Sequence, residues 1–599
     1  MAYNPKHARF PRRERVLPAA MNRPAPRRSP WSTRHAPGWP KPLLALLLLS
    51  LACPSISSTH PGARAAEDRL APILKYIDTG WDTLTRSLAN CDTIVDPKMP
   101  AASVLYFPAR FPEPAAVQQL EKQCRIHVQQ LPLVIRHPGE INPVKLDPPG
   151  LLYLENRYVV PGGRFNEMYG WDSYFIIRGL LQDGRVDLAQ GMVENFFFEI
   201  EHYGAVLNAN RTYYLTRSQP PFLTSTVLAV YDAQKAAGHE DRAWLAKAYN
   251  SAVKDYELWT HEPHLAGTTG LSRYYDFGDG PAPESLQGEP GYYRKVAAFF
   301  FDHPDLRRAY LVEQNSQQPP EPPVGGQYDV RVCDAGQAKA KPECESVKTI
   351  ALSGDFYRGD RAMRESGFDI SFRFGPYGAA THHYAPVCLN SLLYKSERDL
   401  ARMSEILGRK EDTEKWQKRG EDRKEKIQKY LWDSQRGLFF DYDFEKRAQS
   451  SYEYATTFYP LWAGLATPEE ARAVLQNAAI FEQPGGLVTS RRETGAQWDF
   501  PYAWAPIQLL AVEGMRRYGF NDEANRISYE FLSMVEENFR RDTTIREKYN
   551  AVTRSSETQV SAGYQANVVG FGWTNGVFLE LLHQLPRDWV ARLAKDAGE

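Results

Sequence analysis

The sequence predicts an all-α fold of antiparallel helices joined by alternating short and long connections. Three observations support this prediction. Beyond residue 67, apolar residues recur with a helical period. Strand-like runs are few and short, as in residues 437–444, and residues that combine charge, aromatic rings, glycine and proline gather in the long connections.

Residues 1–66 predict an export leader ahead of a single folded domain, residues 67–599. Residues 1–41 are rich in arginine and proline, residues 42–53 form one apolar run, and Ala63 and Ala65 are small residues at a signal-peptidase spacing. The run is too short to span a bilayer, so no stable membrane span is expected after leader removal. Met21 is an alternative start, and Cys53 is a poor lipidation site. We expect a periplasmic or secreted protein.

Export permits disulfides, and five cysteines follow the leader. Cys333 and Cys344 flank a polar stretch and predict one disulfide. Cys91 with Cys124 is a reasonable second pair, which leaves Cys388 as a buried free thiol. The alternative is that all five are reduced and fill the core. Because no spacing of cysteine and histidine resembles a zinc site, no metal is expected.

The helical segments follow one another along the chain. Each of them has an apolar and a charged face: residues 186–204, 221–238, 241–259, 389–407, 506–519 and 521–539. Thr467, Pro468 and Glu470 predict a helix start, because they supply an N-cap, a proline in the first turn and a capping-box glutamate.

Composition excludes one class of partner. The net charge is −1, so nothing indicates a basic surface for nucleic acid. Aromatic residues make up 12% of the chain, which suits a large core or surfaces that stack on sugar rings. Composition alone favours the core.

Five loop regions combine acids or arginine with aromatic residues beside glycine or proline. They are residues 161–175, 208–222, 280–285, 364–374, and the pair 497–506 with 545–550. Taken singly, Trp171 or Trp498 is better explained as a core residue. Together the five regions predict a carbohydrate cleft, where rings stack on sugar faces and polar side chains bind hydroxyls.

These regions resemble the trehalases, glycoside hydrolase family 37. PGGRFNEMYGWDSYF (161–175) looks like the first family signature and QWDFPYAWAP (497–506) like the second. The resemblance continues in the family's order through NRTYYLTRSQPPF, ESGFDISFRF, EKYN and GFGWTNGVFLELL, and covers roughly residues 75–585. It implies an (α/α)6 toroid with long active-site loops at one end. Residues 314–350 look like an insertion in this catalytic domain.

The resemblance also implies the catalytic pair of an inverting hydrolase. Asp369 is implied as the general acid and Glu547 as the general base, with carboxyls about 6.5–9.5 Å apart around a water molecule. Phe368, Phe372 and Phe374 are expected to line an apolar pocket around Asp369. As alternatives, Asp369 is only a turn or helix-cap residue, and Glu547 only pairs with Arg546 or Lys548.

The implied substrate-binding residues come from several loops. They are Arg164, Phe165, Tyr169, Trp171, Asp172, Asn208, Arg217, Gln219, Glu284, Trp498 and Asp499. Arg164 and Asp172 are expected to hold sugar hydroxyls, with a buried ion pair between them as the alternative. Gly162 and Gly163 are expected to let the backbone turn tightly against the sugar.

The chain departs from the family pattern at several positions. Ala282 stands where the family has an arginine, Tyr564 near the expected glutamate of a lid segment, and Cys388 where aspartate is usual. The leading expectation is an exported inverting hydrolase of α,α-trehalose that releases two glucose molecules. Hydrolysis of another α-glucoside and sugar binding without catalysis are the alternatives, and a polysaccharide lyase is a more remote one. The expected partner is a small disaccharide, and no cofactor is expected because two carboxylates and water suffice.

Overall fold

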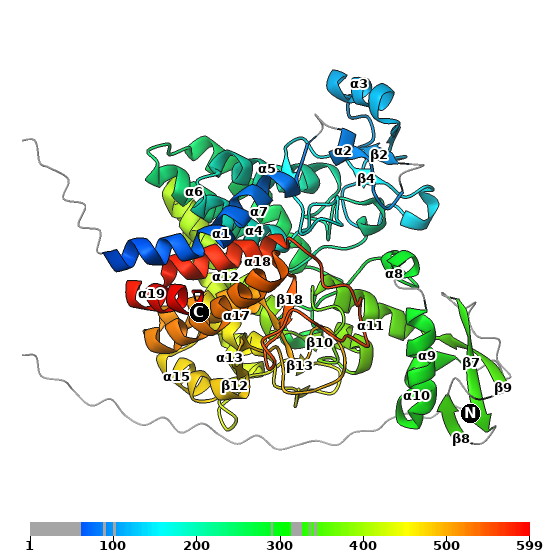
Figure 1. Cartoon of the computed structure of the whole chain (residues 1–599). Helices are drawn as coiled ribbons and strands as arrows, with labels where there is room; N and C mark the ends of the chain where they lie inside the picture. Colours follow the sequence, from blue (N-terminus) through cyan, green and yellow to red (C-terminus); the bar gives the residue numbers. More distant parts are fainter. Residues whose placement is uncertain are drawn as a thin grey trace, which may run out of the picture. The chain divides into compact units, whose positions relative to one another are not determined.

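A closed ring of six helices forms the centre of the folded unit. The computed structural model describes residues 61–87, 91–99, 103–288, 291–312, 326–334, 337–340, 344 and 346–598. Each ring helix packs on the next, and the last packs on the first (Figure 1). In ring order the helices are α4 (Asp172–Gln182), α6 (Leu223–Ala236), α12 (Val387–Leu407), α14 (Tyr459–Ala463), α16 (Ala505–Arg517) and α18 (Gly572–Gln584).

A second layer of helices covers this ring, and from α4 onward inner and outer helices alternate along the chain. The outer helices are α1 (Pro61–Leu84), α5 (Val186–His202), α7 (Arg242–Trp259), α13 (Lys410–Tyr430), α15 (Pro468–Gln476) and α17 (Asn521–Asp542), and α19 (Arg587–Asp596) packs on α1 and α17. The predicted capping box is present at α15, where Thr467 and Glu470 bond to each other's backbone N–H groups. The predicted (α/α)6 toroid is therefore confirmed.

The ring closes where α18 meets α4, and glycine makes the close approach possible. A Cβ atom on Gly179 would clash with the backbone of Gly576, and one on Gly576 would clash with the carbonyl oxygen of Phe175. Beside this contact, Arg178 of α4 pairs with Glu580 of α18 at 2.8 Å. Backbone packing and a buried ion pair thus hold the two helices together.

Strands are short and serve the connections. β17 (Tyr502–Trp504) pairs antiparallel with β18 (Lys548–Asn550), which sets two of the predicted loop regions side by side. β2 (Val104–Phe107) lies between parallel β3 (His127–Gln130) and β4 (Leu151–Leu152). The run predicted at residues 437–444 forms two strands, β12 (Leu438–Phe439) and β13 (Tyr442–Asp443).

Smaller elements complete the connections. The remaining short strands are β1 (Thr85–Arg86), β5 (Tyr158–Val159), β10 (Tyr384–Ala385), β11 (Trp432–Asp433), β14 (Ala448–Gln449), β15 (Glu482–Gln483) and β16 (Gly486–Leu487), and two short helices near the N-terminal end are α2 (Cys91–Ile94) and α3 (Ala115–Cys124).

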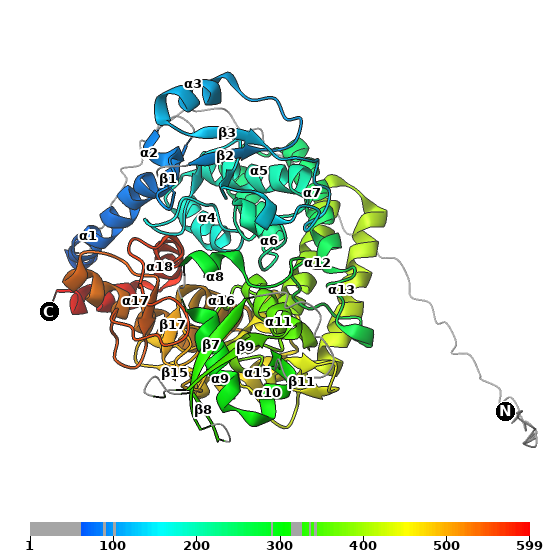
Figure 2. The same cartoon turned by 90° about the vertical axis from the view of Figure 1, so that its right-hand side faces the viewer.

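One long connection carries a small sheet. It runs through α8 (Pro283–Gly288), α9 (Tyr292–Asp302) and α10 (Pro304–Tyr310) into β6 (Leu311–Val312), β7 (Gln327–Asp334), β8 (Gln337–Ala340) and β9 (Ser346–Leu352), and then into α11 (Gly354–Glu365). The strand order is β6-β9-β7-β8, and Figure 2 shows the neighbouring strands β7 and β9 side by side. Part of the predicted insertion falls in this sheet, and residues 314–325, 335–336, 341–343 and 345 of it lie outside the described residues.

The cysteine predictions agree with the structure where it describes them. Cys91 and Cys124 form a disulfide, and Cys388 is buried and free. Cys344 is also disulfide-bonded. The side chain of Cys333, its expected partner, lies outside those described.

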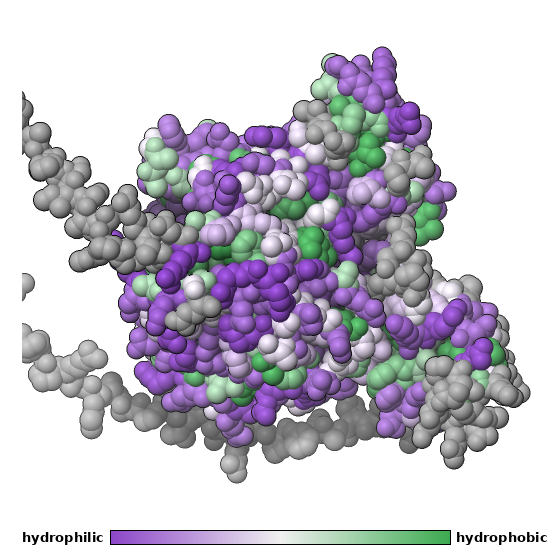
Figure 3. Space-filling view, in the orientation of Figure 1, coloured by the Kyte–Doolittle hydropathy of each residue, from purple (hydrophilic) through white to green (hydrophobic). Residues whose placement is uncertain are grey.

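The predicted leader falls mostly outside the described part of the chain. Only residues 61–66 belong to it, and they lie within α1, so the leader boundary stays a prediction. Among the described residues, the helices are too short or too polar to cross a membrane. The face shown in Figure 3 is mainly hydrophilic, with small scattered hydrophobic areas.

Candidate active site

A cavity of about 740 Å³ gathers nearly all the predicted site residues. Its size is typical of small-molecule sites, which span about 300–1,000 Å³. Of the predicted residues, these line it: Arg164, Phe165, Tyr169, Trp171, Asp172, Asn208, Arg217, Gln219, Glu284, Asp369, Trp498 and Glu547. Loops from six separate parts of the chain therefore meet in one place.

The opening loop supplies an aromatic wall. Trp171 precedes α4, and its backbone N–H donates to the side-chain oxygen of Gln219 at 3.0 Å. Its ring contacts those of Trp498 and Trp573, with centroids 5.7 and 5.6 Å apart. Burial, and next the charge of Glu547, raises the pKa of Asp172 well above its usual range. The wall thus joins tilted and edge-on tryptophan rings to a carboxyl that resists ionisation.

A buried ionic network behind this wall escaped the sequence analysis. Glu167 accepts hydrogen bonds from Arg211 Nε and, at 2.7 Å, from Lys98 Nζ. Arg211 also pairs with Asp96 at 2.7 Å. Burial alone would raise the pKa of Glu167, but the two cations outweigh it and lower the pKa to about 2. The network fixes the opening loop to the segment before β2.

An acid between two arginines forms the opposite wall. Glu284 Oε1 lies 2.5 Å from Arg217 Nη2 and 3.9 Å from Arg364 Nη1. Burial would raise the pKa of Glu284, but the guanidinium groups, led by Arg217, lower it. Ala282 is fully buried and does not line the cavity. Arg364, which the sequence analysis did not single out, brings a guanidinium into the cavity from α11.

Asp369 lies in the segment that follows α11. Its carbonyl accepts a hydrogen bond from the side chain of Gln497, and the N–H of Trp498 donates to the next carbonyl, of Ile370, at 3.1 Å. Gly367 has a φ of +75°, and a Cβ there would lie 2.8 Å from Trp171. These contacts fix the backbone that presents Asp369, which caps no helix.

The expected phenylalanine pocket is wrong. Phe368, Phe372 and Phe374 do not line the cavity. Phe368 and Phe374 are buried behind it, where Phe368 packs edge-on against Trp498. Tryptophan rings form the apolar surface instead, because the phenylalanine side chains point into the packed layer below.

Glu547 is held from several sides. Tyr564 Oη donates to Oε1, Lys548 Nζ lies 3.1 Å from Oε2, and Trp573 Nε1 donates to the backbone carbonyl at 3.2 Å. Burial, and next the Glu547 charge, raises the pKa of Tyr564. Burial lowers the pKa of Lys548 despite the opposing carboxylate. The alternative ion pair with Lys548 therefore exists, and it coexists with a position in the cavity.

Asp499 lies behind the cavity rather than in its wall. It is fully buried and accepts hydrogen bonds from Ser371 Oγ and the N–H of Phe372, both at 2.9 Å. Thr494 Oγ1 donates to it at 2.6 Å. Asp499 therefore braces the segment after Asp369, and its prediction as a cavity residue is not supported.

The opening loop contacts the 561–571 segment, and the alternative ion pair of Arg164 with Asp172 is absent. Arg164 is exposed and forms no ion pair with Asp172; its guanidinium lies over the rings of Phe165 and Tyr564, at 4.8 and 4.9 Å. A Cβ on Gly162 would lie 2.7 Å from Val568, so Gly162 is needed for close packing with that segment. Among the described residues, no group of three metal-ligating side chains lies in the cavity.

Comparison with known proteins decides the family. The Trehalase family model matches residues 118–586. The chain belongs to the trehalase family. A probable trehalase of Eremothecium gossypii is 36% identical over 586 residues, covering 86% of this chain and 73% of that protein. A cytosolic neutral trehalase of Emericella nidulans is 37% identical, with coverage of 86% and 72%.

A solved structure supports the same family. Neutral trehalase Nth1 from Saccharomyces cerevisiae aligns with a TM-score of 0.70 at 32% identity, covering 88% of this chain and 96% of that one. The predicted family and the predicted enzyme class, a glycoside hydrolase, are thereby confirmed.

The predicted location is contradicted. Relatives of this trehalase-family chain in Emericella nidulans and Saccharomyces cerevisiae are named cytosolic neutral trehalases. The predictions of export, of a signal peptide and of a periplasmic or secreted protein are therefore not supported.

Proposed function

We propose that the protein hydrolyses α,α-trehalose to two glucose molecules with inversion, using Asp369 as general acid and Glu547 as general base. One observation carries the proposal: these two carboxylates, far apart in the sequence, line the same cavity. The trehalase names of the relatives support the substrate.

The chemistry needs one proton donor and one proton acceptor. Asp369 gives its proton to the glycosidic oxygen as the bond between that oxygen and the anomeric carbon breaks. Glu547 takes a proton from a water molecule that attacks the same carbon from the opposite face. One glucose leaves in the α form and the other forms as β. Proton exchange with solvent then restores both carboxyl groups.

The two walls suit the two sugar rings. Trp171 offers a ring face, and Asp172 offers a carboxyl for hydroxyl groups. Across the cavity, Arg217, Glu284 and Arg364 form a charged group of the kind that binds hydroxyls with two hydrogen bonds at once. Arg364 supplies the guanidinium that Ala282 lacks. We expect Arg364→Ala to raise KM about tenfold, whereas Ala282→Gly should leave KM within about twofold.

Proton NMR of the anomeric signals tests the proposal. With trehalose, the first minutes should show equal release of α- and β-glucose. Asp369→Asn and Glu547→Gln should lower kcat by at least about 100-fold. Asp422→Asn, at a half-buried position on α13 outside the cavity, is the matched control and should keep wild-type activity. Release of α-glucose alone would exclude inversion, and no turnover by folded protein would exclude trehalose as substrate.

Tyr564 favours one alternative, hydrolysis of a different α-glucoside. Its ring lines the cavity near the position where the family has a lid glutamate, so one sugar contact differs from the family pattern. A panel of α-glucosides and glucosylated polyols separates these outcomes, since the better substrate has the higher kcat/KM. Binding of trehalose without any turnover would instead support a sugar-binding protein.

A further inference from the structure

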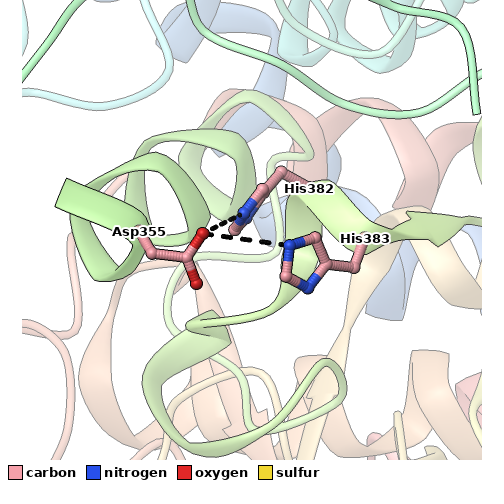
Figure 4. Close-up of side chains that lie close together, drawn as sticks. All are labelled: Asp355, His382 and His383. Carbon is pink, nitrogen blue, oxygen red and sulfur yellow. Dashed lines mark hydrogen bonds and ion pairs between the residues drawn. The ribbon is translucent and has the colours of Figure 1, made fainter. Parts of the chain in front are cut away.

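Two histidines and an aspartate converge outside the cavity. Asp355 lies in the first turn of α11, and His382 and His383 lie in the 3-10 helix η5 (Thr381–His383). Figure 4 shows both imidazoles facing the Asp355 carboxylate. His382 Nε2 is 3.0 Å and His383 Nε2 is 3.9 Å from Asp355 Oδ1, and the two ring centroids are 3.9 Å apart.

We propose that Asp355, His382 and His383 bind one divalent transition-metal ion such as Zn²⁺. Zinc binds imidazole nitrogen and carboxylate oxygen at about 2.0–2.2 Å, so two ligand atoms at tetrahedral positions lie about 3.4 Å apart. The two observed nitrogen–oxygen distances, 3.0 and 3.9 Å, lie on either side of this value. The three ligand atoms all lie within 4.8 Å of one another, so side-chain movements of about an ångström would bring them around one ion.

The donor set selects the kind of ion. Two imidazoles with one carboxylate suit zinc, cobalt, nickel or copper, whereas calcium and magnesium take oxygen ligands. His382 is buried with 3% of its surface exposed, which fixes its ring. His383 and Asp355 have 29% and 41% of their side chains exposed, so an ion can enter and water can fill the remaining position.

Two neighbouring groups limit the affinity. His382 Nδ1 is buried without a hydrogen-bond partner, so the proton that it carries when Nε2 binds an ion finds no acceptor. Missing partners of this kind weaken metal sites by about 10- to 100-fold. Arg358, one turn along α11, places a positive charge near Asp355 and His382, and this charge repels a metal ion. We therefore expect a dissociation constant for zinc in the micromolar range.

The ion would tie the start of α11 to η5. The other end of α11 bears Arg364 and leads into Asp369, so the site lies on the element that positions one wall of the cavity. Without an ion, the contact of His382 with Asp355 at 3.0 Å is the stronger of the two side-chain pairs, and His383, at 3.9 Å, contributes little. The contribution of His383 therefore separates a metal site from a structural ion pair.

Zinc titration of the full chain, purified without a histidine tag and dialysed against a chelator, tests the proposal. Competition with a chromophoric chelator should show one zinc site per chain, with a dissociation constant in the micromolar range. His383→Ala and Asp355→Asn should weaken it by at least about tenfold. His239→Ala, at an exposed position far from the three ligands in the sequence, should leave the zinc affinity unchanged. Cobalt added alone should give the visible absorption of a nitrogen-ligated ion in the wild type and lose it in His383→Ala.

Two results would overturn the proposal. One is a wild-type protein with no zinc site tighter than about 100 μM. The other is unchanged zinc affinity in His383→Ala. That half-buried position is the decisive one, because its substitution leaves the His382–Asp355 contact intact even if Asp355→Asn fails to fold.

Discussion

Replacing Tyr564 by phenylalanine removes one hydrogen bond to the proposed general base and leaves the ring in place. The phenol donates to Glu547 Oε1, and Lys548 supplies a second donor to Oε2. A hydrogen bond to a charged group contributes about 1.5–3 kcal/mol. Because Lys548 remains, we take the lower end of this range for Tyr564→Phe.

The kinetic constants give the sign of the effect. The phenol holds the Glu547 carboxylate at the place where it accepts a proton from the attacking water in the proposed reaction, so its loss leaves the base in position for a smaller fraction of the time. Since about 1.4 kcal/mol corresponds to a factor of ten in rate, kcat should fall about tenfold.

Initial rates of glucose release at several trehalose concentrations measure this change. Tyr564→Phe should have a kcat about tenfold below that of the wild type, with KM changed by less than about threefold. Tyr518→Phe is the control, because that phenol donates to the distant carbonyl of Ala466. A kcat in Tyr564→Phe equal to the wild-type value would refute the reasoning.

Three further substitutions test the packing around the site and the core. Burial raises the pKa of Asp255 from 3.8 to about 7, so the stability of the folded protein falls as pH rises through this window. Asp255→Asn should therefore increase the free energy of unfolding, measured in urea, by up to about 4 kcal/mol at pH 8 but little at pH 4; equal effects at both pH values would contradict this. Glu167→Gln removes one of the two buried carboxylates that pair with Arg211, and also the partner of Lys98, and should cost about 3–5 kcal/mol, seen as a lower Tm; an unchanged Tm would show that the network contributes nothing. Gly367→Ala combines a positive φ with a clash at Trp171 and should lower both stability, by about 1–3 kcal/mol, and kcat/KM; wild-type kinetics would exclude a role for this turn.

The sequence predicted the site where a single segment carried both the motif and the side chain that faces the cavity. Helical periodicity located α12 and its neighbours, and the two signatures brought Trp171 and Trp498 to the same site. Asp499 shows the limit: it directly follows Trp498 in one turn, yet the two side chains point to different places. Motif membership does not state which way a side chain points.

Contacts between distant segments were beyond the sequence. The hydrogen bond from Tyr564 to Glu547 joins a loop without any periodic pattern to the residue that precedes β18. Glu167 and Arg211 lie in separate loops, and nothing in their spacing indicates a buried pair. Asp355 and His382 are 27 residues apart on two elements, so no metal-binding spacing appears along the chain. In each case tertiary packing, rather than local pattern, brings the groups together.

The glycine contact between α4 and α18 also determines when the cavity can exist during synthesis. The loop before α4 is synthesised early, but Glu547, Tyr564 and α18 emerge from the ribosome about 400 residues later. At about 5–20 residues per second, the half-built ring waits about 20–80 s for its closing helix. Throughout that interval the face of α4 that later contacts α18 has no partner in the nascent chain. A chaperone would therefore need to shield this face of α4.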